Sequence, residues 1–366
     1  MSVRVDCDLL TGYLGSGKTT LLNAWLRSPL SAGTAVVVNE VGDIGIDQLV
    51  LAQVTDNVML LESGCLCCTL SGTLRETLLD VCATARTRGT PLSRIVVETT
   101  GLAEPLPILH SLLGDKILAD SIALNQVIVT VDGQQGLRQL ATQPESVRQL
   151  AAAECVVITK ADLAPPDDLR RLRQAVVSMN PTAVLRESVA GNAADATFTA
   201  AAGGPQRQAV HAAMAATRAE PHSHDHHAHD AHDAHGDGHA HSLFHSRVST
   251  LGFYIDHLIP WPGLAAWWHL VSNHYGDNLL RGKGLLRMQD PVRPFVFMQT
   301  VGKVFHPPGP VDTWPDPDPR SRLVCIGVDL DPAWLEQSLA ALRIDEPGFL
   351  PATLAELSSF VPTHSE

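Results

Sequence analysis

The sequence predicts an α/β fold: a doubly wound, mostly parallel sheet followed by a second, smaller α+β domain. Short β-branched runs alternate with helical segments from residue 3 to about residue 187. A glycine-rich segment stands directly between the first run and the first helical segment. The 366 residues also exceed the ~250 to 300 at which one hydrophobic core stops growing. Two domains are therefore expected.

The strands of the first domain are predicted from seven apolar runs. Their apolar residues are mostly consecutive, which is typical of parallel strands that helices cover on both faces. Between them, residues 18–28 and 72–88 show helical periodicity, and Gly89 ends the second helix. The seven runs are RVDCDLL, TAVVVNE, NVMLLES, RIVVETT, NQVIVTVD, ECVVITK and AVLRES.

Changes in composition predict the domain boundaries. Residues 1–190 form the first domain, and an Ala-, Gly- and His-rich linker occupies residues 191–246. Folded character returns at 247–345, where a Trp-rich helix, several strands and a final helix near 331–343 predict a small α+β domain. Residues 346–366 are expected to be a partly ordered tail.

Charge and hydropathy exclude several classes of partner. The chain has 26 Lys and Arg against 39 Asp and Glu, a formal charge of -13 and no basic stripe, so nucleic acid is not an expected partner. No stretch approaches the ~18 apolar residues of a membrane span, and Asp6 and Asp8 interrupt the N-terminal segment. We expect a cytoplasmic protein that makes no membrane contact. In that compartment, clustered cysteines more often bind metals or react than form disulfides.

Residues 12–20, GYLGSGKTT, match the phosphate-binding pattern G-x-x-x-x-G-K-[ST]. Glycines let the backbone curl around phosphates, so that its N–H groups and the helix N-terminus point at negative charge. We expect Lys18 to reach the β and γ phosphates and the Thr19 hydroxyl to bind Mg²⁺. The pattern predicts a P-loop NTPase sheet. The predicted nucleotide-binding residues of this loop are Gly12, Gly15, Ser16, Gly17, Lys18, Thr19 and Thr20.

The run RIVVETTGLAEP indicates a second phosphate element, because it resembles a Walker B strand that continues into a switch loop. Glu98 is predicted near Mg²⁺ and the Gly101 N–H near the γ phosphate. The alternative is a buried strand that ends in an ordinary carboxylate.

The segment ITKADL at 158–163 is close to the N-K-x-D motif that recognises guanine. The Asp162 carboxylate can accept two hydrogen bonds from guanine N1 and N2, which adenine cannot donate, and the Lys160 stem would pack against the base or ribose. Thr159 replaces the usual Asn, which removes an amide that would brace the loop or contact the base. GTP is favoured over ATP.

Cys65, Cys67 and Cys68 lie in ESGCLCCTL, where they could form a disulfide, fill a core or bind a soft metal. Thiolates suit zinc and Cu(I). In an extended segment Cys65 and Cys67 point to one side and Cys68 to the other, so all three converge only if the chain bends. Two thiolates with outside ligands are equally compatible. Since the segment follows a strand, we expect it at the same edge of the sheet as the phosphate loop.

Residues 39–47, NEVGDIGID, supply acidic side chains after the second strand. Glu40 is the predicted additional metal ligand, and Asp43 or Asp47 is predicted to contact Mg²⁺ or water. The alternative for the two aspartates is a solvated loop. His110 is a further residue that could approach the metal site, whereas Cys7, Cys82, Cys155 and Cys325 are predicted to be core residues.

The linker contains ten histidines and four aspartates between residues 222 and 245, with no apolar pattern that could fold. Neutral imidazole binds Zn, Co, Ni and Cu, and a flexible array can capture an ion in many geometries. The alternative is a solvated spacer. The predicted auxiliary metal ligands are His222, His224, His226, His227, His229, His232, His235, His239, His241 and His245.

In this order, GYLGSGKTTL, NEVGDIGID, GCLCC, ETTGLAEP and TKAD resemble the CobW-like GTPases, as do LLRGKGLLRM and SRLVCIGVDLD after the linker. These are metallochaperones related to the GTPases that insert nickel into urease and hydrogenase. The resemblance implies GTP and Mg²⁺ at residues 12–20, a transition-metal site at Cys65, Cys67 and Cys68 near Glu40, and a C-terminal domain that contacts a client metalloprotein.

The sequence therefore predicts a GTP-hydrolysing metallochaperone that releases its metal to a client according to the bound nucleotide. Zinc is favoured by thiolate chemistry, while Co²⁺ or Fe²⁺ remain alternatives by resemblance. Two other hypotheses stay open: a His-rich metal store with little GTPase activity, and a small-molecule kinase that uses the same phosphate loop. Both a monomer and a homodimer are compatible with the sequence.

Overall fold

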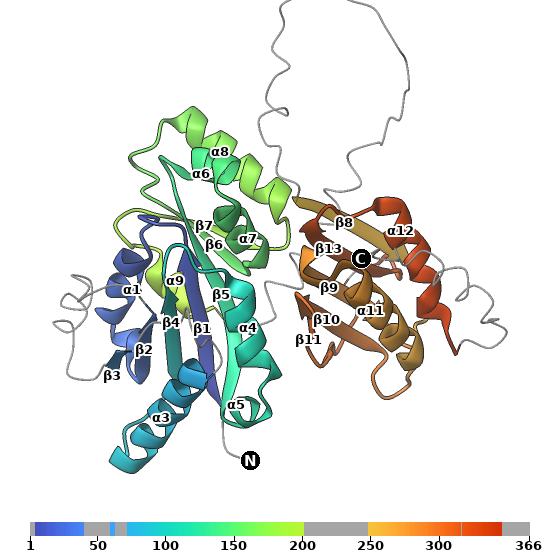
Figure 1. Cartoon of the computed structure of the whole chain (residues 1–366), viewed down its shortest axis with the longest axis horizontal. Helices are drawn as coiled ribbons and strands as arrows, with labels where there is room; N and C mark the ends of the chain where they lie inside the picture. Colours follow the sequence, from blue (N-terminus) through green and yellow to red (C-terminus); the bar gives the residue numbers. More distant parts are fainter. Residues whose placement is uncertain (1–3, 40–58, 63–71, 201–247, 316, 346–366) are drawn as a thin grey trace, which may run out of the picture.

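The computed structural model describes residues 4–39, 59–62, 72–200, 248–315 and 317–345. In these ranges the chain forms two sheets, each with its own helices (Figure 1). Glu40, Asp43, Asp47, the three clustered cysteines and the histidines of the linker lie outside the described residues.

The first sheet has seven strands in the order β3-β2-β4-β1-β5-β6-β7, and every neighbouring pair is parallel. Each of the seven apolar runs forms one strand, so the predicted fold class is confirmed. The strands are β1 (Val5–Gly12), β2 (Thr34–Asn39), β3 (Met59–Glu62), β4 (Arg94–Thr99), β5 (Ile122–Asp132), β6 (Cys155–Thr159) and β7 (Val184–Ser188).

Helices cover both faces of this sheet, as the consecutive apolar runs require. One face packs against α1 (Lys18–Leu26) and α9 (Ala194–Phe198), through Leu21, Trp25 and Phe198. The other face packs against α3 (Gly72–Arg88), α4 (Pro105–Gly114), α5 (Lys116–Ser121), α6 (Gly136–Thr142), α7 (Pro144–Ala152) and α8 (Pro166–Met179). A short 3-10 turn, η1 (Pro29–Ser31), follows α1.

The structure differs from the predicted linker at its beginning, because α9 belongs to the first domain. Phe198 is fully buried and stacks on Trp25 with ring centroids 5.3 Å apart. The chain reaches α1 through Gly191, whose φ is +85° and where a Cβ would lie 2.5 Å from the Cβ of Ala24. A single aromatic residue in an Ala- and Thr-rich stretch thus anchors a segment that composition alone assigns to a linker.

The second domain is an antiparallel sheet in the order β11-β10-β9-β13-β8, and β12 pairs with β10. The helices α11 and α12 and the 3-10 turn η3 cover its outer face, and the predicted final helix is divided into α12 and η3. The elements are β8 (Val248–Ile255), α11 (Trp261–Tyr275), η2 (Gly276–Asn278), β9 (Leu279–Arg287), β10 (Phe295–Val301), β11 (Val304–Phe305), β12 (Gly309–Pro310), β13 (Ser321–Val328), α12 (Pro332–Ser338) and η3 (Leu339–Arg343).

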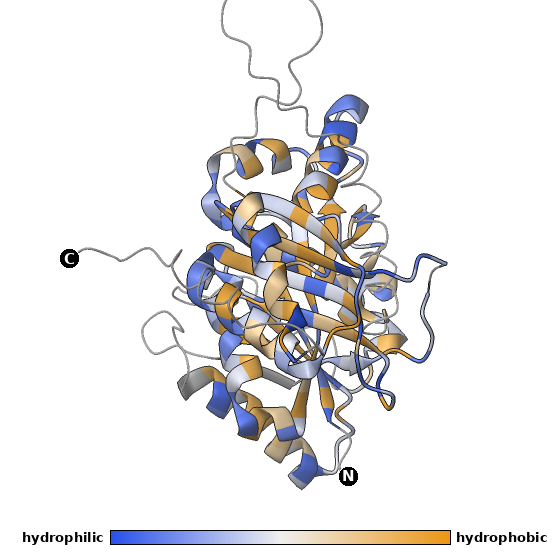
Figure 2. Cartoon of the chain, turned by 90° about the vertical axis from the view of Figure 1, so that its right-hand side faces the viewer, coloured by the Kyte–Doolittle hydropathy of each residue, from blue (hydrophilic) through white to orange (hydrophobic). Residues whose placement is uncertain are grey.

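The inner face of the second sheet packs against the first domain, with Leu285, Phe297 and Val324 in the same hydrophobic cluster as the α7 and α8 side chains. Figure 2 shows hydrophobic positions along the strands and hydrophilic positions on loops and outer helix turns. Two cations of β9 lie buried in this interface. Arg281 Nη2 donates to Glu154 Oε1 at 2.5 Å, and Lys283 Nζ donates to the Thr182 carbonyl at 3.3 Å.

The four cysteines predicted to be core residues are all buried, which confirms that prediction. They are Cys7, Cys82, Cys155 and Cys325. His110 on α4 lies against the second domain, where a Cβ on Gly302 would lie 2.6 Å from its Nε2. None of the helices in the described part of the chain combines the length and apolar character that crossing a bilayer requires.

Candidate nucleotide site and the neighbouring cysteine segment

The phosphate loop lies where β1 ends and α1 begins, at the carboxyl edge of the parallel sheet. Gly17 precedes the helix with φ +90°, a left-handed conformation that an L side chain rarely adopts. Gly12 has φ +143°, and a Cβ there would lie 2.4 Å from the Thr130 carbonyl oxygen. Both glycines are therefore required by the backbone path, which supports the phosphate-loop interpretation.

A cavity of about 370 Å³ opens beside this loop. Among the predicted site residues, the structure brings eight to this cavity, and it places Gly12 and Ser16 in the loop behind it. Asp162 is exposed and does not line it. The lining residues are Leu14, Gly15, Gly17, Lys18, Thr19, Thr20, Val38, Glu98, Thr99, Thr100, Gly101 and Lys160.

Lys18 lies within the loop, with 9% of its surface exposed. Its Nζ donates to the carbonyl oxygens of Gly12 at 2.9 Å and Tyr13 at 3.3 Å. An ammonium group held inside a ring of backbone groups is a compact positive charge, which is the kind of group that binds a phosphate oxygen. The position agrees with the predicted role of Lys18, which stays a prediction.

Thr19 and Glu98 form the candidate Mg²⁺ pair. The Thr19 hydroxyl donates to Glu98 Oε1 at 2.7 Å, and Glu98 is only 5% exposed at the end of β4. A hydroxyl and a carboxylate are the oxygen donors that hard divalent cations prefer, and Mg²⁺ is commonly held by one or two protein oxygens together with substrate phosphates. The donor set fits Mg²⁺.

The cysteine segment begins at this same edge. Val38 of β2 pairs in register with both Glu62 of β3 and Glu98 of β4, so the three backbones form one row. At a strand spacing of about 5 Å, the row places the end of β3 about 10 Å from the backbone of Glu98. The chain then enters residues 63–71. The positions of Cys65, Cys67, Cys68 and Glu40 themselves lie outside the described residues.

The loop after β6 braces the phosphate loop. Thr159 Oγ1 donates to the Ser16 carbonyl at 2.6 Å, so a hydroxyl bonds to the loop at the position where the motif has Asn. Lys160, with φ +52°, donates from Nζ to the Gly15 carbonyl at 2.9 Å and to Asp132 Oδ2 at 2.6 Å. Sequence reasoning missed Asp132, although it ends a predicted strand at the same edge.

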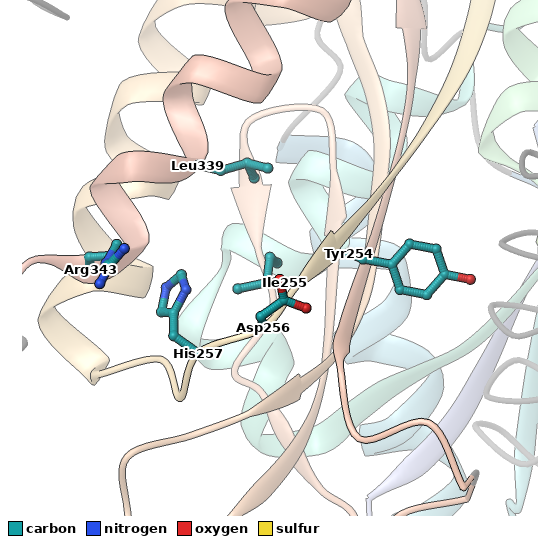
Figure 3. A pocket seen from close by; sticks show the side chains of 6 residues that line it. All are labelled: Tyr254, Ile255, Asp256, His257, Leu339 and Arg343. Atoms are coloured by element: carbon teal, nitrogen blue, oxygen red, sulfur yellow. The ribbon is translucent and has the colours of Figure 1, made fainter. Parts of the chain in front are cut away.

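A second cavity lies in the C-terminal domain between the end of β8 and η3 (Figure 3). Its lining contains no glycine, which distinguishes it from the nucleotide site. Its lining residues are Tyr254, Ile255, Asp256, His257, Leu339 and Arg343.

A glycine-rich loop between a parallel strand and a helix, with a lysine inside it and a Thr–Glu pair beside it, defines a P-loop nucleotide-binding protein. Residues 7–186 match the CobW/HypB/UreG nucleotide-binding domain, and residues 248–343 match the cobalamin synthesis protein CobW C-terminal domain. The chain belongs to the CobW family, so the resemblance seen in the sequence is confirmed.

Curated relatives carry similar sequences. The zinc chaperone YjiA of Escherichia coli is 30% identical over 49% of this chain and 56% of the relative. The zinc chaperone CobW of Pseudomonas aeruginosa is 31% identical over 50% of this chain and 55% of the relative, so the chain spans about half the length of these proteins. The zinc chaperone CobW of a Sinorhizobium species is 26% identical over 93% of this chain and 97% of its own length.

Among solved structures, that of Zn(II)-bound YjiA GTPase from E. coli has the same fold. The TM-score is 0.65 at 21% identity, and the match covers 93% of this chain and all of that one. At this identity the likeness shows the fold, including both domains.

Proposed function

We propose that this chain hydrolyses GTP to GDP and phosphate and uses the reaction to control the binding of a transition metal, with zinc preferred. In this account it is a metallochaperone that hands the metal to a client protein. The names of its relatives, zinc chaperones in E. coli and P. aeruginosa, support the same class.

One observation carries the proposal. Glu98, which accepts a hydrogen bond from Thr19, lies in the same strand row as Glu62, which stands three residues before Cys65. Groups that sense a γ phosphate and soft thiolate ligands would then lie at one edge of the sheet. Neither a metal store nor a small-molecule kinase accounts for both features, since a store needs no phosphate loop and a kinase needs no thiolates.

Each residue of the nucleotide site has a proposed role. Lys18 would stabilise negative charge on the β and γ phosphates, and the Gly101 N–H would hold the γ phosphate in line for attack by water. Thr19 and Glu98 would hold Mg²⁺, which when bound neutralises charge on the phosphates. Asp162 would select guanine at the rim of the site.

The metal site would be assembled by the nucleotide. Bound GTP would hold the loops after β2 and β4, so that Glu40 and the thiolates of Cys65, Cys67 and Cys68 are brought together. Hydrolysis would release these loops and lower the affinity of the site for the metal. The histidines between 222 and 245 would capture ions at modest affinity, because the sequence has no apolar pattern there and each binding mode would have to order the segment. The C-terminal domain would contact the client.

The test combines turnover and metal content. GTP and ATP hydrolysis are measured with Mg²⁺, with and without zinc, for the whole chain, for Lys18→Ala and for Lys116→Ala, a control at an exposed helix position. We expect Lys18→Ala to lose at least about a hundredfold in turnover while the control stays unchanged. Undiminished turnover in Lys18→Ala would remove this loop from the active site.

Metal-stimulated GTP turnover would exclude a passive store. Deleting residues 222–245 is expected to lower the number of zinc ions bound while leaving turnover unchanged. A phosphorylated small-molecule product would favour the kinase instead.

A further inference from the structure

Gln149 on α7 contacts the loop that follows β4, although 46 to 48 residues separate them in sequence. Its side chain is fully buried, and its Nε2 donates to the carbonyl oxygens of Gly101 at 3.1 Å and Ala103 at 3.0 Å. Its Oε1 has no hydrogen-bond partner within the described part of the chain. The side chain is therefore oriented by the two carbonyls that its amide nitrogen reaches.

The contacted loop lies against the phosphate loop. A Cβ at Gly101 would lie 2.6 Å from the backbone nitrogen of Leu14, so there is no room for a side chain between the two loops. The Ala103 N–H donates to the Thr100 carbonyl at 3.1 Å, which closes a turn around Gly101. A shift of this turn changes the position of the Gly101 N–H relative to the cavity.

The helix that carries Gln149 is fixed at its C-terminal end, directly after Gln149. Asn180, which is 1% exposed, donates from Nδ2 to the carbonyl oxygens of Leu150 at 2.9 Å and Ala153 at 3.0 Å. Arg281 of the second domain donates to the Ala152 carbonyl at 3.1 Å. These bonds hold carbonyls at the C-terminal end of α7, where a helix leaves its last carbonyl groups without intrahelical partners. The helix is thus a rigid support for Gln149.

We propose that Gln149 is a positioning residue for the γ phosphate: by holding the carbonyls of Gly101 and Ala103, it aims the Gly101 N–H at the terminal phosphate of GTP. The proposal rests on the proposed function, because it assigns a role in the same nucleotide site. Gln149 does not line the cavity, so its effect is exerted through the loop. GDP lacks the terminal phosphate and should not depend on this residue.

The test compares affinities for the GTP analogue GTPγS and for GDP, both with Mg²⁺, in the full-length chain. The variants are Gln149→Met, which removes the amide, and Gln149→Glu, which keeps the length and one oxygen but lacks the –NH₂ donor. Gln126→Met is the matched control, because it removes another buried glutamine amide, whose Nε2 donates to the Thr197 carbonyl at 2.9 Å, in α9 rather than in α7 or the loop after β4. GTP turnover is measured in parallel as kcat and KM.

For both Gln149 variants we expect the GTPγS affinity to fall about tenfold while GDP affinity changes less than twofold, since a hydrogen bond to a charged phosphate is weakened. We expect kcat to fall by at least as much. Gln126→Met should lower the unfolding midpoint and leave the ratio of the two affinities unchanged.

Two results would overturn the proposal: an unchanged affinity ratio in whichever Gln149 variant folds, or an equal fall of that ratio in Gln126→Met. A wild-type protein that binds GTPγS but hydrolyses no GTP would contradict the proposed function alone. The affinity ratio would still decide the role of Gln149.

Discussion

Replacing Lys283 with methionine removes one of two cations buried in the interface between the domains. Lys283 and Arg281 are each 1% exposed on β9, and Glu154, which is 4% exposed, is the carboxylate that pairs with Arg281. Burial, and then the nearby charge of Arg281, lower the pKa of Lys283 to about 7. The Thr182 carbonyl accepts its hydrogen bond at 3.3 Å. Methionine has a similar length and carries no charge.

The lowered pKa sets the size and sign of the effect. A fall from 10.5 to about 7 corresponds to no more than about 5 kcal/mol in the free energy of unfolding. Between these two pH values the unfolded state binds more protons, so the wild-type free energy of unfolding rises with pH across that window. Below pH about 7 the full free-energy cost of burying the charged Lys283 ammonium is present. Replacing buried ions with hydrophobic residues often raises the free energy of unfolding by about 1 to 4 kcal/mol. Losing the hydrogen bond to the Thr182 carbonyl lowers it by about 1 kcal/mol.

We therefore expect Lys283→Met to raise the free energy of unfolding by about 1 to 3 kcal/mol at pH 7, and the gain to disappear by pH 10. Urea unfolding at several pH values measures it. Lys303→Met is the control, because the Lys303 side chain is 52% exposed and should change little. A variant that is less stable than wild type at pH 7, or a gain that does not shrink with rising pH, would refute the reasoning.

Two further predictions concern the nucleotide site. Gly101→Ala should lower nucleotide affinity and turnover by at least about tenfold, because its Cβ would meet the Leu14 nitrogen at 2.6 Å, whereas Gly114→Ala, with nothing within 4 Å, should change neither. Fluorescent nucleotide titration measures both, and wild-type affinity in Gly101→Ala would contradict the packing argument. Thr159→Val should lower GTP and GDP affinity alike by about fivefold, since it removes the hydroxyl that braces the Ser16 carbonyl and also reaches the Val131 carbonyl at 3.3 Å. A loss confined to one nucleotide would contradict a purely bracing role.

The fold was predictable because its signals are local. Consecutive apolar runs specify buried parallel strands, and the spacing of Gly12, Gly17 and Lys18 specifies a phosphate loop wherever it joins a strand to a helix. The pairing of Thr19 with Glu98 follows from the same rule, since both stand at carboxyl ends of the sheet.

The residues that sequence reasoning missed depend on contacts between distant segments. Gln149 looks like a polar residue of an ordinary helix until α7 is placed over the loop after β4. Along β9, Arg281 and Lys283 alternate with other residues as solvent-facing side chains would, yet the first domain covers that face. Phe198 gives too short an apolar signal to predict α9. Periodicity describes one element and contains no information about what covers it.

The most direct test of the central claim is the zinc affinity of the chain lacking residues 222–245, measured by competition titration with GTPγS and Mg²⁺ and again with GDP. Removing the histidines leaves the cysteine segment as the predicted zinc site. The account predicts that zinc binds at least about fivefold more tightly in the GTPγS state, and linkage then requires zinc to tighten GTPγS binding by the same factor. Equal zinc affinities in the two states would contradict it.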